Sequence, residues 1–75
     1  MKIVGIATSR FHEILDSFLA DGWEQTYIYA GMDAGIDYSE YHLRKGAETL
    51  KFVWDNWTEG EIEGSESVIA IIKTG

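Results

Sequence analysis

Carboxylates gather in one short segment of the chain, between Asp55 and Glu66. Within it Asp55, Glu59, Glu63 and Glu66 follow one another at intervals of three or four residues. Calcium in proteins takes about six to eight oxygen ligands, many of them carboxylate oxygens. The spacing therefore supports one hypothesis of a calcium site formed by these four side chains.

The same twelve residues resemble the calcium-binding loop of the EF-hand family. In this resemblance Asp55 opens the loop, Gly60 takes the sharp turn and Glu66 closes the loop as the bidentate ligand. Trp57, however, stands where the loop needs an oxygen side chain, and Glu59 is longer than the usual ligand. A solvated acidic turn is the alternative interpretation, and no metal ligands are assigned.

Two tryptophans, Trp54 and Trp57, lie at the start of this segment. Side chains three residues apart at the end of a strand point to opposite faces, so we expect one in the core and one exposed. An exposed tryptophan beside carboxylates is a suitable anchor for a protein partner. We therefore place Trp54, Trp57, Asp55, Glu59 and Glu61 in a predicted protein-binding surface. Simple coverage of a thin core is the alternative.

Tyrosines supply the rest of that predicted surface. Tyr27 and Tyr29 share one face of a predicted strand, whereas Tyr38 and Tyr41 face opposite sides of the next strand. If helices cover only one face of the sheet, tyrosines on the other face form an exposed aromatic patch suited to protein contact. Tyr27 and Tyr29 are therefore included as protein-binding residues. Ordinary cross-strand pairing is the alternative.

Catalytic residues are not expected. His12 lies beside the apolar stripe of a predicted helix and His42 lies in a predicted strand, and neither has a carboxylate, a nucleophile or a second histidine at a typical catalytic spacing. Glu61 and Glu63 alternate on an extended segment, but flanking glycines predict exposure rather than the burial that tunes paired carboxylates. We therefore expect a non-enzymatic protein without a cofactor.

The excess of acidic residues indicates which classes of partner the protein can bind. The formal net charge is −7, and both the stretch between Arg10 and Arg44 and the 55–66 segment are free of lysine and arginine. Such a surface repels phosphate, so direct nucleic-acid binding is not expected. Acidic runs also suit an alternative function, an inhibitor that mimics nucleic acid on a basic protein surface. Charge that merely keeps the protein soluble is the simpler explanation.

Hydrophobic spacing predicts six elements. A period of about 3.6 residues marks a first helix, capped by Thr8 or Ser9 and ended by Asp21 and Gly22. The β-branched and alternating segments are read as strands, with a glycine-bounded turn at 31–35 and a two-residue turn at Lys45-Gly46. Ser65 favours a C-terminal helix, although its isoleucines also suit a strand. The predicted strands are 2–7, 23–30, 36–44 and 47–55, and the predicted helices are 8–21 and 65–73.

Together these elements predict an α+β fold of the order β-α-β-β-β-α, with a mainly antiparallel sheet covered on one face by helix. The 75 residues form a single domain, 1–75, and the absence of cysteine excludes disulfides. We expect a small, acidic, cytoplasmic protein-interaction module with no membrane contact, whose partner is another protein or a second copy of the chain.

Overall fold

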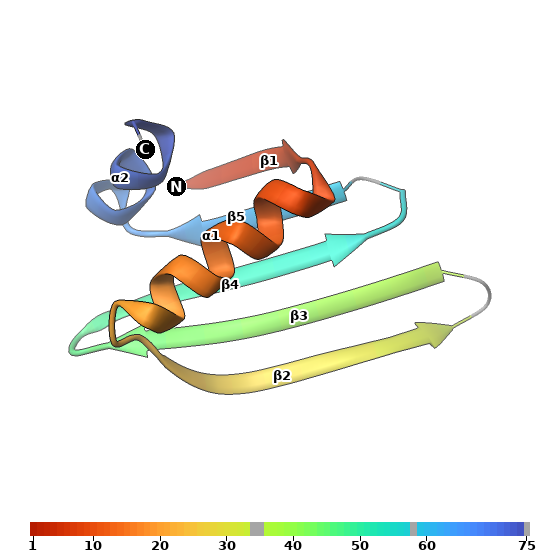
Figure 1. Cartoon of the computed structure of the whole chain (residues 1–75), viewed down its shortest axis with the longest axis horizontal. Helices are drawn as coiled ribbons and strands as arrows, with labels where there is room; N and C mark the ends of the chain where they lie inside the picture. Colours follow the sequence, from red (N-terminus) through yellow and green to blue (C-terminus); the bar gives the residue numbers. More distant parts are fainter. Residues whose placement is uncertain (34–35, 58, 75) are drawn as a thin grey trace.

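The computed structural model describes residues 1–33, 36–57 and 59–74. Its elements follow the order β-α-β-β-β-β-α (Figure 1). They are β1 (Lys2–Ile6), α1 (Thr8–Ala20), β2 (Glu24–Asp33), β3 (Ile36–Lys45), β4 (Glu48–Asp55), β5 (Glu59–Gly64) and α2 (Glu66–Thr74). The α+β class and the helical C-terminal segment are confirmed. One strand, β5, was not predicted.

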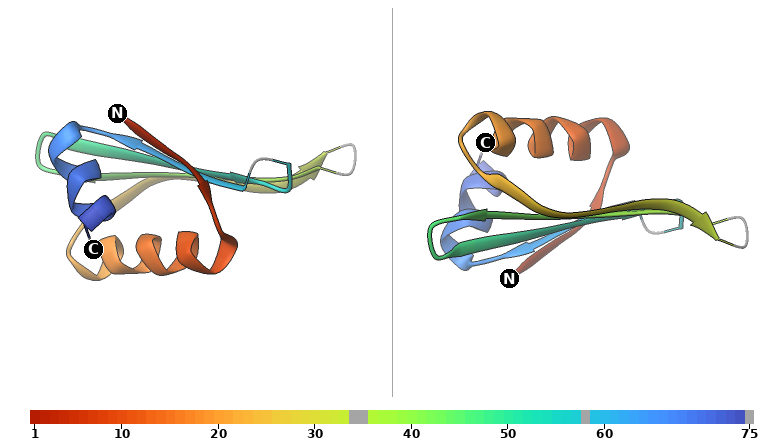
Figure 2. Two further views of the ribbon diagram at one scale, coloured as in Figure 1. Left: turned by 90° about the horizontal axis from the view of Figure 1, so that it is seen from above. Right: turned by 90° about the horizontal axis from the view of Figure 1, so that it is seen from below.

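The strands form one five-stranded sheet in the order β1-β5-β4-β3-β2, and every neighbouring pair is antiparallel. The strands from β2 to β5 form a meander, and β1 adds to its end beside β5. Two edges remain, β1 on one side and β2 on the other (Figure 1). The β2–β3 hairpin extends beyond the end of α1 (Figure 2).

The hydrophobic core lies between α1, α2 and one face of the sheet. The α1 stripe buries Phe11, Ile14 and Leu15 as its spacing predicts. Phe11 packs edge-on against Phe52 of β4, with ring centroids 5.7 Å apart. In the described ranges every buried side chain is apolar. Figure 2 shows both helices on this side of the sheet, so no helix of the described residues covers the opposite face.

The segment predicted to be an acidic turn instead contains β5. Its pattern is alternating: Gly60 and Ile62 are buried beneath the helices, while Glu61 and Glu63 point to the other face. Gly60 is required here, because an added Cβ would lie 2.7 Å from Phe11 Cδ1 and 3.0 Å from the Ile6 carbonyl oxygen. A glycine that signals a turn in the sequence thus makes room for a neighbouring aromatic ring.

Three local predictions are corrected. The N-cap of α1 is Ala7, which makes no side-chain hydrogen bond. The Thr8 hydroxyl instead accepts a hydrogen bond from Trp54 Nε1. Regular alternation predicts Trp23 and Tyr27 on one face of the strand. A β-bulge between Gln25 and Tyr27 shifts the register of β2, so Trp23 is buried while Tyr27 is exposed on the opposite face. The two-residue turn lies one position later than predicted, at Gly46 and Ala47, because Lys45 pairs with Glu48.

The C-terminal end of α1 is as the sequence indicates. Gly22 ends α1 with a φ of 97°, and the Trp23 amide donates to the Phe18 carbonyl at 3.2 Å. The predicted turn at 31–35 falls partly outside the described residues, and β2 continues through Gly31 to Asp33. Neither helix in the described part of the chain is long and apolar enough to cross a membrane.

Candidate functional site

The uncovered face of the sheet divides into a charged half and an aromatic half. Strand register places one row of side chains straight across it, and the row reads Lys2, Glu63, Lys51, His42 and Tyr27. A second row carries Glu61, Val53, Glu40 and Tyr29. Lysines and glutamates thus predominate in the β1, β5 and β4 half, whereas the β3 and β2 half carries the rings, with Glu40 among them.

Five residues of the aromatic half form what we call the tyrosine patch: Tyr27, Tyr29, Tyr38, Glu40 and His42. Rings pair across β2 and β3, with centroids 4.8 Å apart for Tyr27 and His42 and 5.9 Å apart for Tyr29 and Tyr38. Tyr27 and Tyr29 are each 46% exposed. The patch therefore offers aromatic surface whose rings are already held in place by their neighbours.

Glu40 lies at the centre of the patch and accepts two side-chain hydrogen bonds. The Tyr38 hydroxyl donates to Oε1 at 2.5 Å, and His42 Nε2 contacts Oε2 at 2.5 Å. An ionised carboxylate can only accept, so the Nε2 of His42 carries the hydrogen in this arrangement. All three residues lie on β3 at alternate positions, which places them on one face of the strand.

These contacts shift two pKa values. The hydrogen bond from Tyr38 is the largest cause that lowers the pKa of Glu40, and the hydrogen bond from His42 adds to it against the opposing effect of burial. The same hydrogen bond, together with burial and the negative charge of Glu40, raises the pKa of Tyr38 to about 12. The charged carboxylate and the neutral phenol therefore stabilise each other.

This arrangement is better suited to holding rings in place than to proton transfer. Glu40 is occupied by two donors, and its side chain is only 19% exposed. Tyr38 keeps its proton across the neutral range because its pKa is about 12. The carboxylate thus orders two rings of β3, and those rings in turn pack against Tyr27 and Tyr29 of β2.

The predicted protein-binding residues do not form one surface. Tyr27 and Tyr29 lie together in the tyrosine patch. Trp54 is half-buried on the helix side, packs against the core, and donates from Nε1 to the Thr8 hydroxyl at 3.1 Å. Trp57 is 76% exposed in the turn after β4. One tryptophan is thus attached to the core and the other is exposed.

The three acidic residues of the predicted protein-binding surface also lie apart from one another. Asp55 orders the turn, because its Oδ1 accepts the Trp57 amide at 2.8 Å. Glu61 lies on the charged half of the open face, where its carboxylate is 3.8 Å from Lys2 Nζ. Glu59 begins β5 with a φ of 64°, a left-handed conformation that is uncommon for a residue with a side chain. These residues therefore serve a turn and a mixed-charge surface.

The structure does not form the loop that the calcium hypothesis requires. Asp55 pairs with Glu59 at one end of β5, whereas Glu66 begins α2 beyond the other end of that strand. Their carboxylates are separated by the length of an extended strand instead of converging on one ion. Within the described ranges, no group of three or more histidine, aspartate or glutamate side chains is arranged to hold a metal.

Acidic side chains are likewise distributed over several surfaces. Glu13 and Asp16 are exposed on α1, Glu40 is on the open face, and Glu48 begins β4. The glutamates of β5 are flanked by cations on both neighbouring strands, since Glu63 pairs in register with Lys2 of β1 and with Lys51 of β4. The described carboxylates thus lack the single aligned track that a nucleic-acid mimic needs.

Sequence reasoning missed the centre of the patch. His42 was expected to have no carboxylate partner, yet Glu40 is two residues away on the same strand and bonds to it. The signal was present, because Tyr38, Glu40 and His42 alternate within a segment predicted to be extended. Assigning alternate residues of the predicted strand to the same face brings all three side chains together, whereas a search for catalytic spacing does not.

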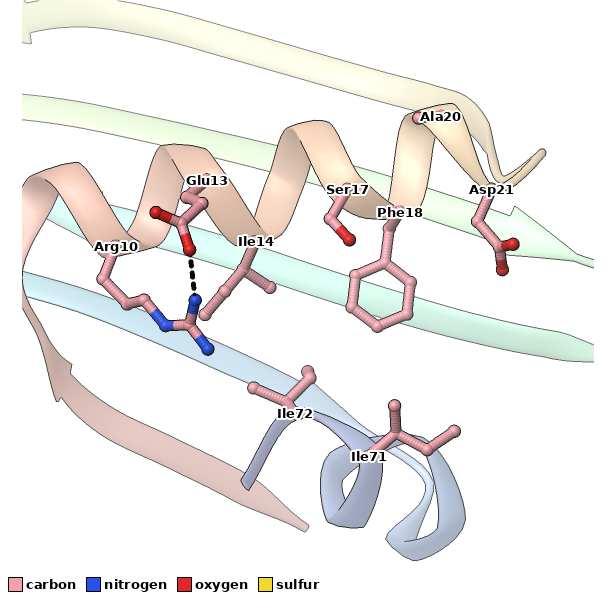
Figure 3. A pocket seen from close by; sticks show the side chains of 9 residues that line it. All are labelled: Arg10, Glu13, Ile14, Ser17, Phe18, Ala20, Asp21, Ile71 and Ile72. Atoms are coloured by element: carbon pink, nitrogen blue, oxygen red, sulfur yellow. Dashed lines mark hydrogen bonds and ion pairs between the residues drawn. The ribbon is translucent and has the colours of Figure 1, made fainter. Parts of the chain in front are cut away.

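A second surface feature is a cleft of about 500 Å³ between the two helices (Figure 3). Ile14 and Phe18 of α1 face Ile71 and Ile72 of α2 across it, and an ion pair between Arg10 and Glu13 lies at one end. Its walls are apolar and its rim is charged. The cleft lies on the helix side of the molecule, apart from the tyrosine patch.

Comparisons with protein-family models, with curated proteins and with solved structures found no significant match to this chain.

Proposed function

We propose that this protein is a non-enzymatic protein-interaction module that binds through the tyrosine patch. The observation that supports the proposal is the uncovered sheet face with two tyrosines, each 46% exposed, at its aromatic end. Tyrosine is enriched in protein interfaces because one rigid side chain offers both apolar area and a hydrogen-bonding hydroxyl. Rings that are already ordered lose less conformational entropy on binding.

Affinity capture with matched variants tests this function. The Tyr27→Ser/Tyr29→Ser protein removes the exposed rings, Trp57→Ser removes the exposed ring of the β4–β5 turn, and Ile71→Ser alters an apolar wall of the helix cleft. We expect a bound protein to be lost only from the tyrosine variant. Circular dichroism should show that all three variants remain folded, because each replaced side chain is exposed.

Capture that survives the loss of both tyrosines would contradict the proposal. If binding is instead lost in Trp57→Ser or in Ile71→Ser, the interface belongs to the turn or to the cleft. Release of the captured protein by moderate salt alone would favour a charge-based contact, since exposed charges are screened beyond about 10 Å at 0.1 M salt.

A further inference from the structure

We propose that the partner of the β2 edge is the β2 edge of a second copy, so that two sheets join into one continuous antiparallel sheet. This inference rests on the proposed function and deepens it, because the tyrosine patch lies directly beside that edge. An edge strand presents unpaired N–H and C=O groups, and proteins protect such edges with lysine, proline, bulges or short length.

The two edges of this sheet differ in protection. At the β1 edge the strand has five residues, carries Lys2, and changes register between Ile3 and Ile6. At the β2 edge the strand has ten residues, and its register with β3 is unbroken from Tyr27 to Asp33. The single bulge of β2 lies before this stretch. Only β2 therefore offers a long regular edge.

Charge also favours a second copy at this edge. The chain has a net charge of −7, yet Gln25 to Met32 contains no charged residue. Repulsion between two identical acidic proteins is weakest where their contact surfaces are neutral. Because the segment also lacks proline, every one of its residues keeps a backbone N–H.

Symmetry then determines which side chains meet. A two-fold axis perpendicular to the sheet relates two antiparallel edges and keeps both open faces on the same side. With the axis at Ile28, Tyr27 of one copy lies opposite Tyr29 of the second copy on the open face. Ile28 meets Ile28 of the second copy on the helix face. This register pairs three consecutive exposed side chains, Tyr27, Ile28 and Tyr29, with one another.

The surroundings extend each of these contacts. Ile28 is 55% exposed and is level with Tyr41 of β3, so the symmetric pair joins two apolar rows on the helix face. On the open face, the Tyr29 ring already contacts Tyr38 and the Tyr27 ring contacts His42. Pairing therefore makes one aromatic band across the junction from two tyrosine patches.

Three lysine substitutions at exposed aliphatic residues test the inference. Ile28→Lys places like charges together at the proposed axis, whereas Val4→Lys alters the β1 edge and Ile71→Lys alters α2. The replaced side chains are similarly exposed, at 55%, 64% and 63% respectively. By sedimentation equilibrium at micromolar concentrations we expect the wild type, Val4→Lys and Ile71→Lys to be dimers and Ile28→Lys to be a monomer. An equimolar mixture of Ile28→Lys and Ile28→Glu should dimerise again.

Hydrogen exchange supplies a measurement that does not depend on a variant being folded. Backbone amides of β2 in the wild type should exchange more slowly as protein concentration rises, while amides of β1 should show no such change. A monomeric wild type, a dimeric Ile28→Lys, or concentration-independent exchange in β2 would each overturn the inference. Dimers lost only in the Tyr27→Ser/Tyr29→Ser protein and not in Ile28→Lys would indicate face-to-face packing and would also overturn it.

The two proposals can fail separately. A monomeric wild type that still captures a protein through Tyr27 and Tyr29 refutes self-pairing and leaves the proposed function intact. A dimer that dissociates in Ile28→Lys, together with protein capture that survives the loss of both tyrosines, supports pairing through the edge and contradicts the proposed function.

Discussion

Glu40 determines how the tyrosine patch responds to acid. Its pKa lies below the ordinary value of 4.5, chiefly because Tyr38 donates to it. A lowered folded-state pKa contributes stability that is fully present above the unfolded value and is lost as pH falls through the folded one. We therefore expect the free energy of unfolding to decrease as pH is lowered from 4.5. In Glu40→Gln that part of the acid dependence should be missing.

Urea unfolding at several pH values measures this effect, with Asp16→Asn on α1 as the matched control. Both variants remove one carboxylate, but only Glu40 accepts hydrogen bonds from two rings of the patch. Parallel pH curves for wild type and Glu40→Gln would show that the pKa of Glu40 is the same in the folded and the unfolded protein, and would contradict this prediction.

Tyr38 should show the complementary behaviour in alkali. Its pKa is raised from 10.0 to about 12. A raised folded-state pKa contributes stability that is present below pH 10 and is lost as pH rises through the folded value. Titration by tyrosinate absorbance should show a late component near pH 12 that is absent from Tyr38→Phe. In Glu40→Gln this component should move to lower pH, and no movement would contradict the assigned hydrogen bond.

At the scale of single elements, β5 depends on a glycine beneath a ring. A methyl group at Gly60 would meet Phe11 and the Ile6 backbone, whereas one at Gly64 would meet the flexible end of Leu50 at 2.5 Å. Overpacking a core costs about 1–3 kcal/mol. We expect Gly60→Ala to lower the free energy of unfolding by about that amount and Gly64→Ala to lower it less. Equal effects in chemical denaturation would refute this difference.

The same strand shows where sequence patterns stop being informative. Helix α1 was predictable because its own residues supply the apolar stripe. In β5 the inward positions are Gly60, Ile62 and Gly64, and the apolar volume above the glycines comes from Phe11 and Leu50 of other elements. The bulge near Thr26 was equally hidden, because a single shift in register reverses the face of every later side chain. Long-range packing decided both features.

For the whole molecule, the fold class followed from the order of helical and alternating segments, and the shared face of Tyr27 and Tyr29 followed from strand parity. The opposite placement of Trp54 and Trp57 followed from the same parity. Trp54 and Trp57 are close in sequence, but a strand end separates them, so the core holds one and the solvent surrounds the other. This placement separates two residues that the sequence analysis assigned to one protein-binding surface.

Net charge gives the last prediction, which concerns how two whole molecules associate. Each copy carries a formal charge of −7, while the proposed contact at β2 is neutral. Salt screens the long-range repulsion between the copies and has little effect on a neutral, apolar contact. The association constant of the dimer, measured by sedimentation equilibrium, should therefore increase as the sodium chloride concentration is raised. Binding of an acidic surface to a basic partner would weaken under the same conditions.

A moderate decrease in pH supplies the control for this effect. Partial protonation of the carboxylates reduces the net charge of each copy, so the gain in dimerisation per increment of salt should diminish. The pH must stay above 4.5, the ordinary value for Glu40, so that the tyrosine patch remains ordered. Dimerisation that weakens with salt at neutral pH would mean that charged groups form the contact, and the neutral β2 edge would then no longer explain association.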